Sequence, residues 1–202
     1  VIKLADRLHN MKTLNFLKRE KQERIAAETM ALYAPLAHRL GMFKLKGQLD
    51  DLAFLYLHTE EYDALLKKVE ATLAGREKNL IATRSSIETV LLGTNIPCRI
   101  LARTKTMWSI YGKMERQQKP FEDIQDALGV RLITDTVANC YALLGIIHTN
   151  FKPVAGSFTD YISTPKLNLY RSLHTTIVSP TGELVEIQIR TEEMHRSSEY
   201  GI

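Results

Sequence analysis

The chain has 202 residues, of which 45% are hydrophobic, so it can form one large domain or two small ones of ordinary globular composition. Its formal net charge of +4 suits a phosphate-bearing ligand or RNA without requiring either. Two cysteines, Cys98 and Cys140, are too few for a disulfide framework, and no apolar run approaches the ~20 residues that span a bilayer. We therefore expect a cytoplasmic protein with reduced thiols and no membrane partner. The chain opens inside a predicted helix, so we expect it to be a piece of a longer protein.

The first part of the chain is predicted to be almost entirely helical. Helical spacing of apolar residues covers 6–17, 23–40, 45–57 and 60–92. Pro35 predicts a kink in the second of these helices, and Gly41 predicts its end. The sequence from Gly93 to Pro97 marks the clearest boundary.

Beyond residue 97, short apolar runs alternate with helical patterns. Strands are predicted over 98–102, 128–133, 175–179 and 184–190, and helices over 105–117 and 138–151. The fold class is therefore α+β: an all-helical N-terminal part followed by a mixed β-sheet flanked by helices. We predict two domains, 1–58 and 59–202, the second remaining helical up to about residue 92.

The predicted strand at 184–190 alternates strictly, which indicates one buried face and one polar face. The polar face carries a carboxylate, an amide and a guanidinium at Glu186, Gln188 and Arg190. A nearby loop, rich in cations and with one well-placed ring, contains Lys166, Asn168, Tyr170 and His174. This combination suits a nucleotide polyphosphate and a metal ion.

In the predicted helix at 105–117, Lys105, Ser109, Lys113 and Arg116 fall on one face, opposite an apolar face. Two interpretations remain open. The row is either an ordinary solvated face or a clamp for a triphosphate, since cations and a hydroxyl bind phosphate oxygens.

Two carboxylates could share one Mg²⁺. Asp126 precedes one predicted strand and Glu186 lies on another, and Mg²⁺ usually takes one or two carboxylates together with water and phosphate oxygens. The alternative is that each is a surface or turn residue. The two carboxylates can share one Mg²⁺ only if the two strands are neighbours in the sheet.

Other candidates have equally plain alternatives. Tyr170 could stack on a nucleobase or pack on the sheet, and His174 could orient a phosphate or bond a backbone group, which the sequence favours. Asp6 and Asn10 share a helix face and could belong to a metal site, but the site would need further ligands.

Several strings of the sequence occur together in one known order. They are residues 3–11, 33–41, 103–105, 109–111, 126–131, 160–162, 172–176 and 186–191. In this order they resemble the RelA/SpoT family, the synthetases and hydrolases of the alarmone (p)ppGpp. The first string resembles the last motif of the family's HD-type hydrolase domain, the second the helical linker after it, and the others the synthetase domain.

The resemblance implies a nucleotidyltransferase-like fold for 59–202 and a hydrolase tail with linker for 1–58. It implies that the 3′-hydroxyl of GTP or GDP attacks the β-phosphorus of ATP and that AMP leaves, in the stringent response. The parent protein would associate with ribosomes through domains outside this chain. No direct nucleic acid binding and no hydrolase activity are expected from this chain.

The resemblance also assigns roles to residues. Glu186 and Asp126 match the catalytic, Mg²⁺-binding carboxylates. The positions around the ATP phosphates match Arg103, Lys105, Ser109, Lys113 and Arg131. Tyr170 matches a tyrosine that stacks on guanine, and the other GTP or GDP positions are Lys166, Asn168, His174 and Gln188. Asp6 matches a Mn²⁺ ligand of the complete hydrolase site.

The chain departs from the family pattern at two places. The stretch Ser157-Phe158-Thr159-Asp160 stands where the family has R-F-K-D or E-F-D-D, and Leu169 stands where it has the Gly of an N-G-Y turn. The first departure leaves open the choice between GTP and GDP, and the second leaves open the local loop conformation. Whether the parent is bifunctional is also open, because Asp6 is present but the other hydrolase ligands are not. The two departures also motivate an alternative, a guanine-nucleotide-binding regulatory module without turnover. A third possibility, an RNA-binding domain, rests only on the basic charge.

Overall fold

The computed structural model describes residues 1–124 and 128–201, and of residues 73–77, 104 and 128 only the backbone. The helices before the sheet are α1 (Ile2–Lys12), η1 (Leu14–Phe16), α2 (Arg19–Glu28), η2 (Thr29–Tyr33), α3 (Ala34–Arg39), α4 (Phe43–Leu57) and α5 (Thr59–Leu91). The remaining elements are β1 (Arg99–Thr104), α6 (Met107–Gln117), η3 (Phe121–Asp123), β2 (Leu128–Thr134), α7 (Val137–Asn150), β3 (Thr159–Asp160), β4 (Leu173–Val178), β5 (Leu184–Thr191) and α8 (Glu192–Tyr200).

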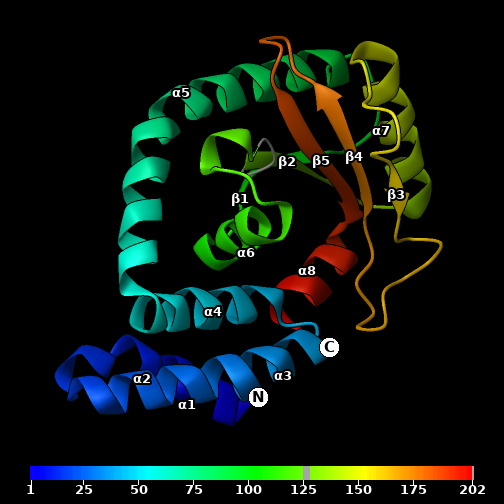
Figure 1. Ribbon diagram of the computed structural model, residues 1–202. Coiled ribbons are helices and arrows are strands. Elements are labelled where there is room, and N and C mark those ends of the chain that lie inside the picture. The colour runs from blue at the N-terminus through cyan, green and yellow to red at the C-terminus, as the bar shows by residue number, and fades with distance from the viewer. Residues whose placement is uncertain (125–127, 202) are drawn as a thin grey trace. The chain divides into compact units, whose positions relative to one another are not determined.

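The chain divides into two compact units, each built from separated stretches of sequence. The first unit comprises 1–70, 106–121 and 197–202, and the second 71–105 and 122–196. Figure 1 colours the chain from its N-terminus to its C-terminus, so α6, in green, can be told from the blue helices of the first unit. The predicted fold class, a helical part followed by a mixed sheet with helices, is confirmed. The predicted division after residue 58 stays a prediction.

The core of the first unit joins α1, α2, α3 and α4. Its smallest members are alanines, which let helix backbones approach closely: Ala26, Ala34, Ala37 and Ala53. Larger side chains, Leu4, Met11, Leu14 and Leu49, fill the space between them. None of the helices in the described residues combines the length and the apolar character needed to cross a membrane.

At Pro35, where the sequence predicts a kink, the helix changes type. Pro35 lies in the first turn of α3, and the preceding turn, Thr29–Tyr33, is a π-helix. A proline has no N–H and its ring crowds the carbonyl one turn earlier, so the regular hydrogen-bond ladder cannot continue there. Gly41 has φ of 73°, as expected for a residue just beyond a helix end.

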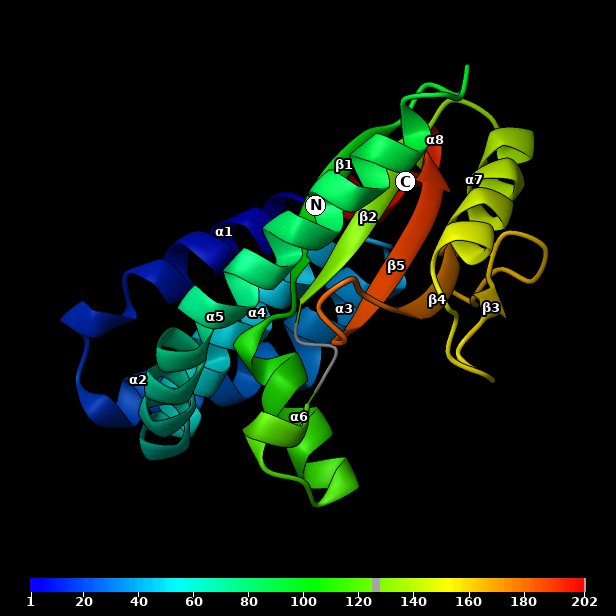
Figure 2. The same ribbon diagram turned by 90° about the horizontal axis from the view of Figure 1, so that it is seen from above.

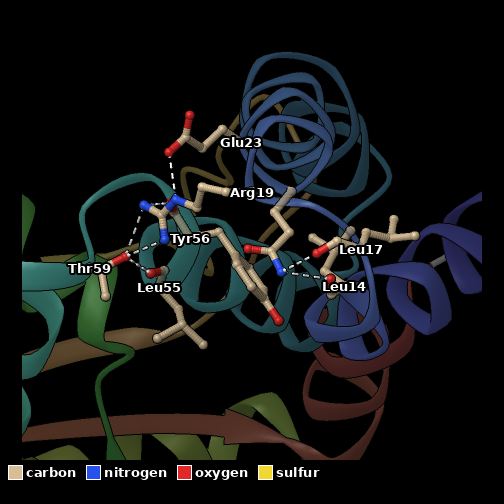
Figure 3. A network of polar contacts seen from close by, with 8 residues as sticks. Leu14, Leu17, Arg19, Glu23, Leu55, Tyr56 and Thr59 are labelled. Atoms are coloured by element: carbon tan, nitrogen blue, oxygen red, sulfur yellow. Dashed lines mark hydrogen bonds and ion pairs between the residues drawn. The ribbon is translucent and has the colours of Figure 1, made fainter.

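A polar network joins α2 to the corner where α4 ends and α5 begins (Figure 3). The Arg19 guanidinium donates to the Tyr56 carbonyl at 3.1 Å and to the Thr59 hydroxyl at 3.3 Å, and it pairs with Glu23 at 2.6 Å. Gln22 donates to the carbonyls of Leu14 and Leu17. Carbonyls at helix ends lack partners within the helix, so these side chains complete the hydrogen bonding there.

The second unit contains a five-stranded mixed sheet of order β1-β2-β5-β4-β3. The β2–β5 pair is parallel and the other pairs are antiparallel. Figure 2 shows the strands side by side with α7 running along the sheet. The apolar face packs against α7 and the second half of α5; its residues include Val130, Leu132, Leu173, Ile177, Val185, Ile187 and Ile189, against Ile87, Leu91, Leu143 and Ile147.

The strands and helices predicted beyond residue 97 are present within a few residues of their predicted ends. The 3₁₀ turn η3, the strand β3 and the helix α8 were not predicted. The strand β3 has only Thr159 and Asp160, too few to show an alternation, and α8 begins directly where β5 ends, with no Gly or Pro between them.

Candidate active site

The face of the sheet opposite the hydrophobic core is polar, because alternation sends every second side chain there. The pairing of strands places residues in rows across this face. One row runs Arg103, Gly129, Glu186 and Thr176. The next row runs Leu101, Arg131, Gln188, His174 and Thr159. Residues far apart in sequence therefore meet around Glu186.

Glu186 is held from both sides. Arg103 of β1 pairs with its Oε2 at 2.6 Å, and His174 of β4 lies with Nδ1 3.4 Å from its Oε1. Gln188 donates from Nε2 to Oε2 at 3.3 Å. The Glu186 side chain is only 18% exposed, so its carboxylate lies in a pocket of polar partners rather than in bulk water.

The electrostatics favour the ionised form of Glu186. Burial acts to raise its pKa, but the hydrogen bond from His174 and the charges of Arg103, His174 and Lys105 outweigh burial, so the pKa is lowered from 4.5. At neutral pH the site thus presents a carboxylate, which only accepts hydrogen bonds. In the contact with Glu186, His174 Nδ1 must then be the donor. The other ring nitrogen, Nε2, is left to bond the Tyr170 hydroxyl.

Gly129 explains how Arg103 reaches Glu186 across an intervening strand. It lies between the two in the row and has no side chain to block the path. A Cβ at this position would come within 2.8 Å of the Glu186 carbonyl oxygen, closer than packing permits. The close approach of β2 and β5 at this point therefore requires glycine.

Two tyrosine rings and a cation gather beside His174. The Tyr170 hydroxyl lies 2.9 Å from His174 Nε2, and the Tyr161 ring meets His174 edge-on with centroids 5.2 Å apart. Lys166 Nζ lies 4.4 Å from the centre of the Tyr161 ring and 5.4 Å from that of Tyr170. The sequence favoured a backbone partner for His174; the structure instead places its ring nitrogens toward Tyr170 and Glu186.

The loop that carries Tyr170 is closed by a tight turn. The Leu169 amide donates to the Lys166 carbonyl at 2.8 Å, and the Tyr170 amide donates to the Asn168 side chain at 3.3 Å. Leu169 has φ of 62°, the conformation that favours glycine. The turn therefore keeps a left-handed residue where the family has Gly, and Asn168 helps to shape it.

Gln188 contributes a further polar group to the site. Only 2% of it is exposed, and its Oε1 is a buried oxygen without a hydrogen-bond partner among the described residues. Arg131 stands next to it in the row. A buried acceptor of this kind is costly unless a ligand or water supplies a donor.

The predicted ATP residues fall in both units. Arg103, Lys105 and Arg131 belong to the second unit, whereas Ser109 and Lys113 lie on α6 in the first. The Ser109 hydroxyl accepts a hydrogen bond of 2.8 Å from Thr106, the residue that caps α6. That these five residues form one phosphate site stays a prediction.

The predicted Mg²⁺ pair is tested only in part. Asp126 lies outside the described residues. The condition set for the pair is met, because β2 and β5 are adjacent and parallel and Gly129 stands opposite Glu186. Asp160 is a further carboxylate of this unit, but its Oδ1 accepts from the amides of Ile162 and Ser163, so it is used in a turn.

The predicted remnant of a Mn²⁺ site lies on α1. Asn10 Nδ2 donates to Asp6 Oδ2 at 3.4 Å, and both side chains are exposed. Within 1–124 and 128–201, no group of three or more His, Cys, Asp or Glu is arranged to hold a metal ion. The role of Asp6 therefore stays a prediction for the parent protein.

Tyr161 is a site residue that the sequence interpretation did not single out. It belonged to a string, residues 160–162, that carries the family resemblance, but nothing in its spacing showed a role. Only the antiparallel pairing of β3 with β4 brings the start of its loop beside His174.

Comparison with known proteins decides the family. A family model described as a region found in RelA / SpoT proteins matches residues 102–202, and one described as an HD domain matches residues 1–43. The chain belongs to the RelA/SpoT family.

Relatives in this family match over the whole chain. A "GTP pyrophosphokinase" of Streptomyces coelicolor is 48% identical over 202 residues, and a "Bifunctional (p)ppGpp synthase/hydrolase RelA" of Mycobacterium tuberculosis is 46% identical. The chain covers 24% and 27% of these relatives, about a quarter of their length. Among solved structures, the small alarmone synthetase 1 from Bacillus subtilis matches 64% of this chain and 74% of its own, with a TM-score of 0.49 and 27% identity.

Proposed function

We propose that this chain carries the synthetase activity of a RelA/SpoT enzyme and transfers pyrophosphate from ATP to the 3′-hydroxyl of GTP or GDP. The observation that carries the proposal is Glu186, an ionised carboxylate on the polar sheet face, held between Arg103 and His174. The names of the Streptomyces and Mycobacterium relatives support the same reaction. We place the activity in the cytoplasm and in the stringent response, within a parent protein that associates with ribosomes through its other domains.

The reaction needs a base near the acceptor hydroxyl. The hydroxyl oxygen forms a bond to the β-phosphorus, the bond from that phosphorus to the oxygen it shares with the α-phosphate breaks, and AMP leaves with the shared oxygen. Glu186 takes the proton of the hydroxyl, since its lowered pKa keeps it unprotonated at neutral pH. Phosphoryl-type transfer otherwise depends on positioning and on charge stabilisation.

The site suits a Mg²⁺ ion. Glu186 offers ionised carboxylate oxygens, the ligands that Mg²⁺ prefers, and we assign Asp126 as the second carboxylate. Bound there, Mg²⁺ would neutralise charge on the phosphates. The cations and hydroxyl that would hold the ATP phosphates are Arg103, Lys105, Ser109, Lys113 and Arg131.

The cluster around Tyr170 would hold the acceptor. The Tyr170 ring would stack on guanine, at roughly 1–3 kcal/mol. Lys166 and Asn168, in the same loop, would also bind the acceptor. His174 would hold Tyr170 and Glu186 in fixed positions relative to each other, because one of its ring nitrogens contacts each of them. The buried Oε1 of Gln188 would accept a hydrogen bond from the acceptor nucleotide.

The test is product formation by the purified chain. With ATP, GTP or GDP and Mg²⁺, chromatography should show AMP and a 3′-pyrophosphorylated nucleotide in equal amounts, and EDTA should stop both. Glu186→Gln should lower kcat by about 10²–10⁴-fold, the usual effect of removing a general base. Glu183→Gln is the matched control, because Glu183 is exposed in the turn before β5.

A specific observation favours a second candidate, a regulatory module that binds guanine nucleotides without turnover. Leu169 holds a left-handed conformation in the acceptor loop, where the family has Gly. GTP binding with no AMP formed at saturating Mg²⁺ would favour this candidate and overturn the enzymatic proposal.

A further inference from the structure

One face of α4 is in contact with α6 along several turns. The residues of this face are spaced as neighbours on a helix: Gly47, Asp51 and Phe54 of α4, and His58, the residue that caps its C-terminus. The contacts lie within the first unit, since α4 and residues 106–121 both belong to it. We define these four residues as the α6 seat.

Asp51 supplies hydrogen bonds to the first turn of α6. Its Oδ1 accepts from the Trp108 amide at 2.9 Å, and the backbone of Met107 also donates to this carboxylate. Thr106 accepts from the Ser109 amide at 3.3 Å. The first amides of a helix have no partner within the helix, so the first three amides of α6 depend on Asp51 and Thr106.

Gly47 lets α6 begin close to α4. A Cβ at Gly47 would lie 2.7 Å from Thr106 Cγ2, a distance that packing does not permit. Glycine in the interior of a helix is otherwise unfavourable by about 1 kcal/mol. Its presence in α4 is explained by the close approach of the residue that caps α6.

The rest of the seat is aromatic. The Phe54 ring lies 5.3 Å from that of Trp108 and 4.7 Å from that of Tyr111, measured between centroids. His58 stacks on Trp108 with an interplanar angle of 25°. These contacts fix the rotation of α6 about its own axis, and with it the direction in which Ser109 and Lys113 project.

We propose that the α6 seat, through Gly47 and Asp51, positions α6 and thereby sets the affinity of the enzyme for ATP. The inference rests on the proposed function, in which Ser109 and Lys113 bind ATP phosphates. Gly47 and Asp51 are positioning residues, because they act through α6. Acceptor affinity does not depend on them, since the acceptor residues lie on other elements.

The test compares two neighbouring aspartates. Loss of a helix cap changes an equilibrium by roughly fivefold, so Asp51→Ala should raise the KM for ATP about fivefold or more and leave the KM for GTP within about twofold. Asp51→Asn keeps an oxygen acceptor and should restore most of the ATP affinity. Gly47→Ala should raise the KM for ATP as Asp51→Ala does.

Asp50→Asn is the matched control. Asp50 is 3% exposed and pairs with Lys46 on the same helix. The variant therefore weakens an ion pair within α4 at the position next to Asp51. It should lower the melting temperature, and it should not raise the KM for ATP relative to the KM for GTP. An unchanged KM for ATP in Asp51→Ala, or an equal rise for ATP and GTP, would overturn the proposal.

A second measurement is independent of activity. Amide hydrogen exchange at Met107 and Trp108 should be faster in Asp51→Ala and unchanged in Asp50→Asn. If the wild-type chain forms no product, the proposed function fails; faster exchange would then still support the seat, and unchanged exchange would overturn it.

Discussion

Leu169 combines an apolar side chain with a left-handed backbone. Its side chain is 61% exposed and its φ is 62°, so it gains little from packing to offset the conformation. For a residue with a Cβ, this conformation costs roughly 1–2 kcal/mol, whereas Asn tolerates it better. The strain lies next to Tyr170, the residue that we propose to stack on the guanine of the acceptor.

We therefore expect Leu169→Asn to raise the free energy of unfolding by about 0.5–1 kcal/mol. Urea denaturation at neutral pH measures the change. Leu167→Asn is the matched control, since Leu167 is exposed in the same loop and has no positive φ. Equal stabilities for the two variants would show that Leu169 carries no strain.

Glu186 predicts a pH dependence of stability. Because its folded-state pKa is lowered from 4.5, the ionised side chain stabilises the fold above that pH, and the contribution is lost as the pH falls through the folded-state pKa. The stability difference between wild type and Glu186→Gln should be constant near neutral pH and shrink below 4.5. Chemical denaturation from about pH 7 down to about pH 3 measures it. A difference that grows on acidification contradicts the assignment.

At the scale of elements, the site depends on how closely two strands approach. Gly129 of β2 meets the Glu186 carbonyl of β5 at a distance that leaves no room for a Cβ. The site depends equally on the order of the strands in the sheet. Only because β5 lies between β2 and β4 do Arg103 and His174 reach the same carboxylate.

Two glycines in the second unit should respond in opposite ways to alanine. Gly129→Ala should destabilise the fold by about 1–3 kcal/mol, because β2 or β5 must shift. Gly145→Ala lies in the exposed middle of α7, where a Cβ meets nothing within 4 Å, and should stabilise it by about 1 kcal/mol. Thermal melting of the two variants compares them directly, and a stable Gly129→Ala protein would contradict the close approach.

At the scale of the whole molecule, neither compact unit is a continuous stretch of sequence. The first unit takes α6 from the middle of the chain, and the second takes the end of α5 from before the sheet. Ile87, Leu91 and Ile100 all lie in the core under the sheet. The segment that matches the RelA/SpoT model, 102–202, contains none of them.

A fragment of residues 102–202 should therefore fail to melt cooperatively. It loses three buried side chains worth about 1.5–3 kcal/mol each, which is comparable to the ~5–15 kcal/mol stability of a typical domain. A fragment of residues 80–202 restores them together with β1 and should recover a cooperative transition by circular dichroism. Equal melting of both fragments would show that the preceding helix is dispensable for the sheet.

The sequence by itself determined the local structure of this protein. Apolar spacing predicted the helices before Gly93, alternation predicted β5 and its polar face, and Pro35 and Gly41 predicted a kink and a helix end. These features depend on residues that are close in the chain, so they can be predicted from the sequence alone. The departure from glycine at Leu169 was likewise visible in the sequence, whereas only the structure shows that the backbone there keeps a positive φ.

Tertiary structure alone decided which residues meet. The pairing of β2 with β5, the contacts of Glu186 with Arg103 and His174, the place of Tyr161 and the seat of α6 on α4 all join residues distant in sequence. Such contacts follow from strand order and helix packing, which are set by the burial of whole apolar faces rather than by any local pattern.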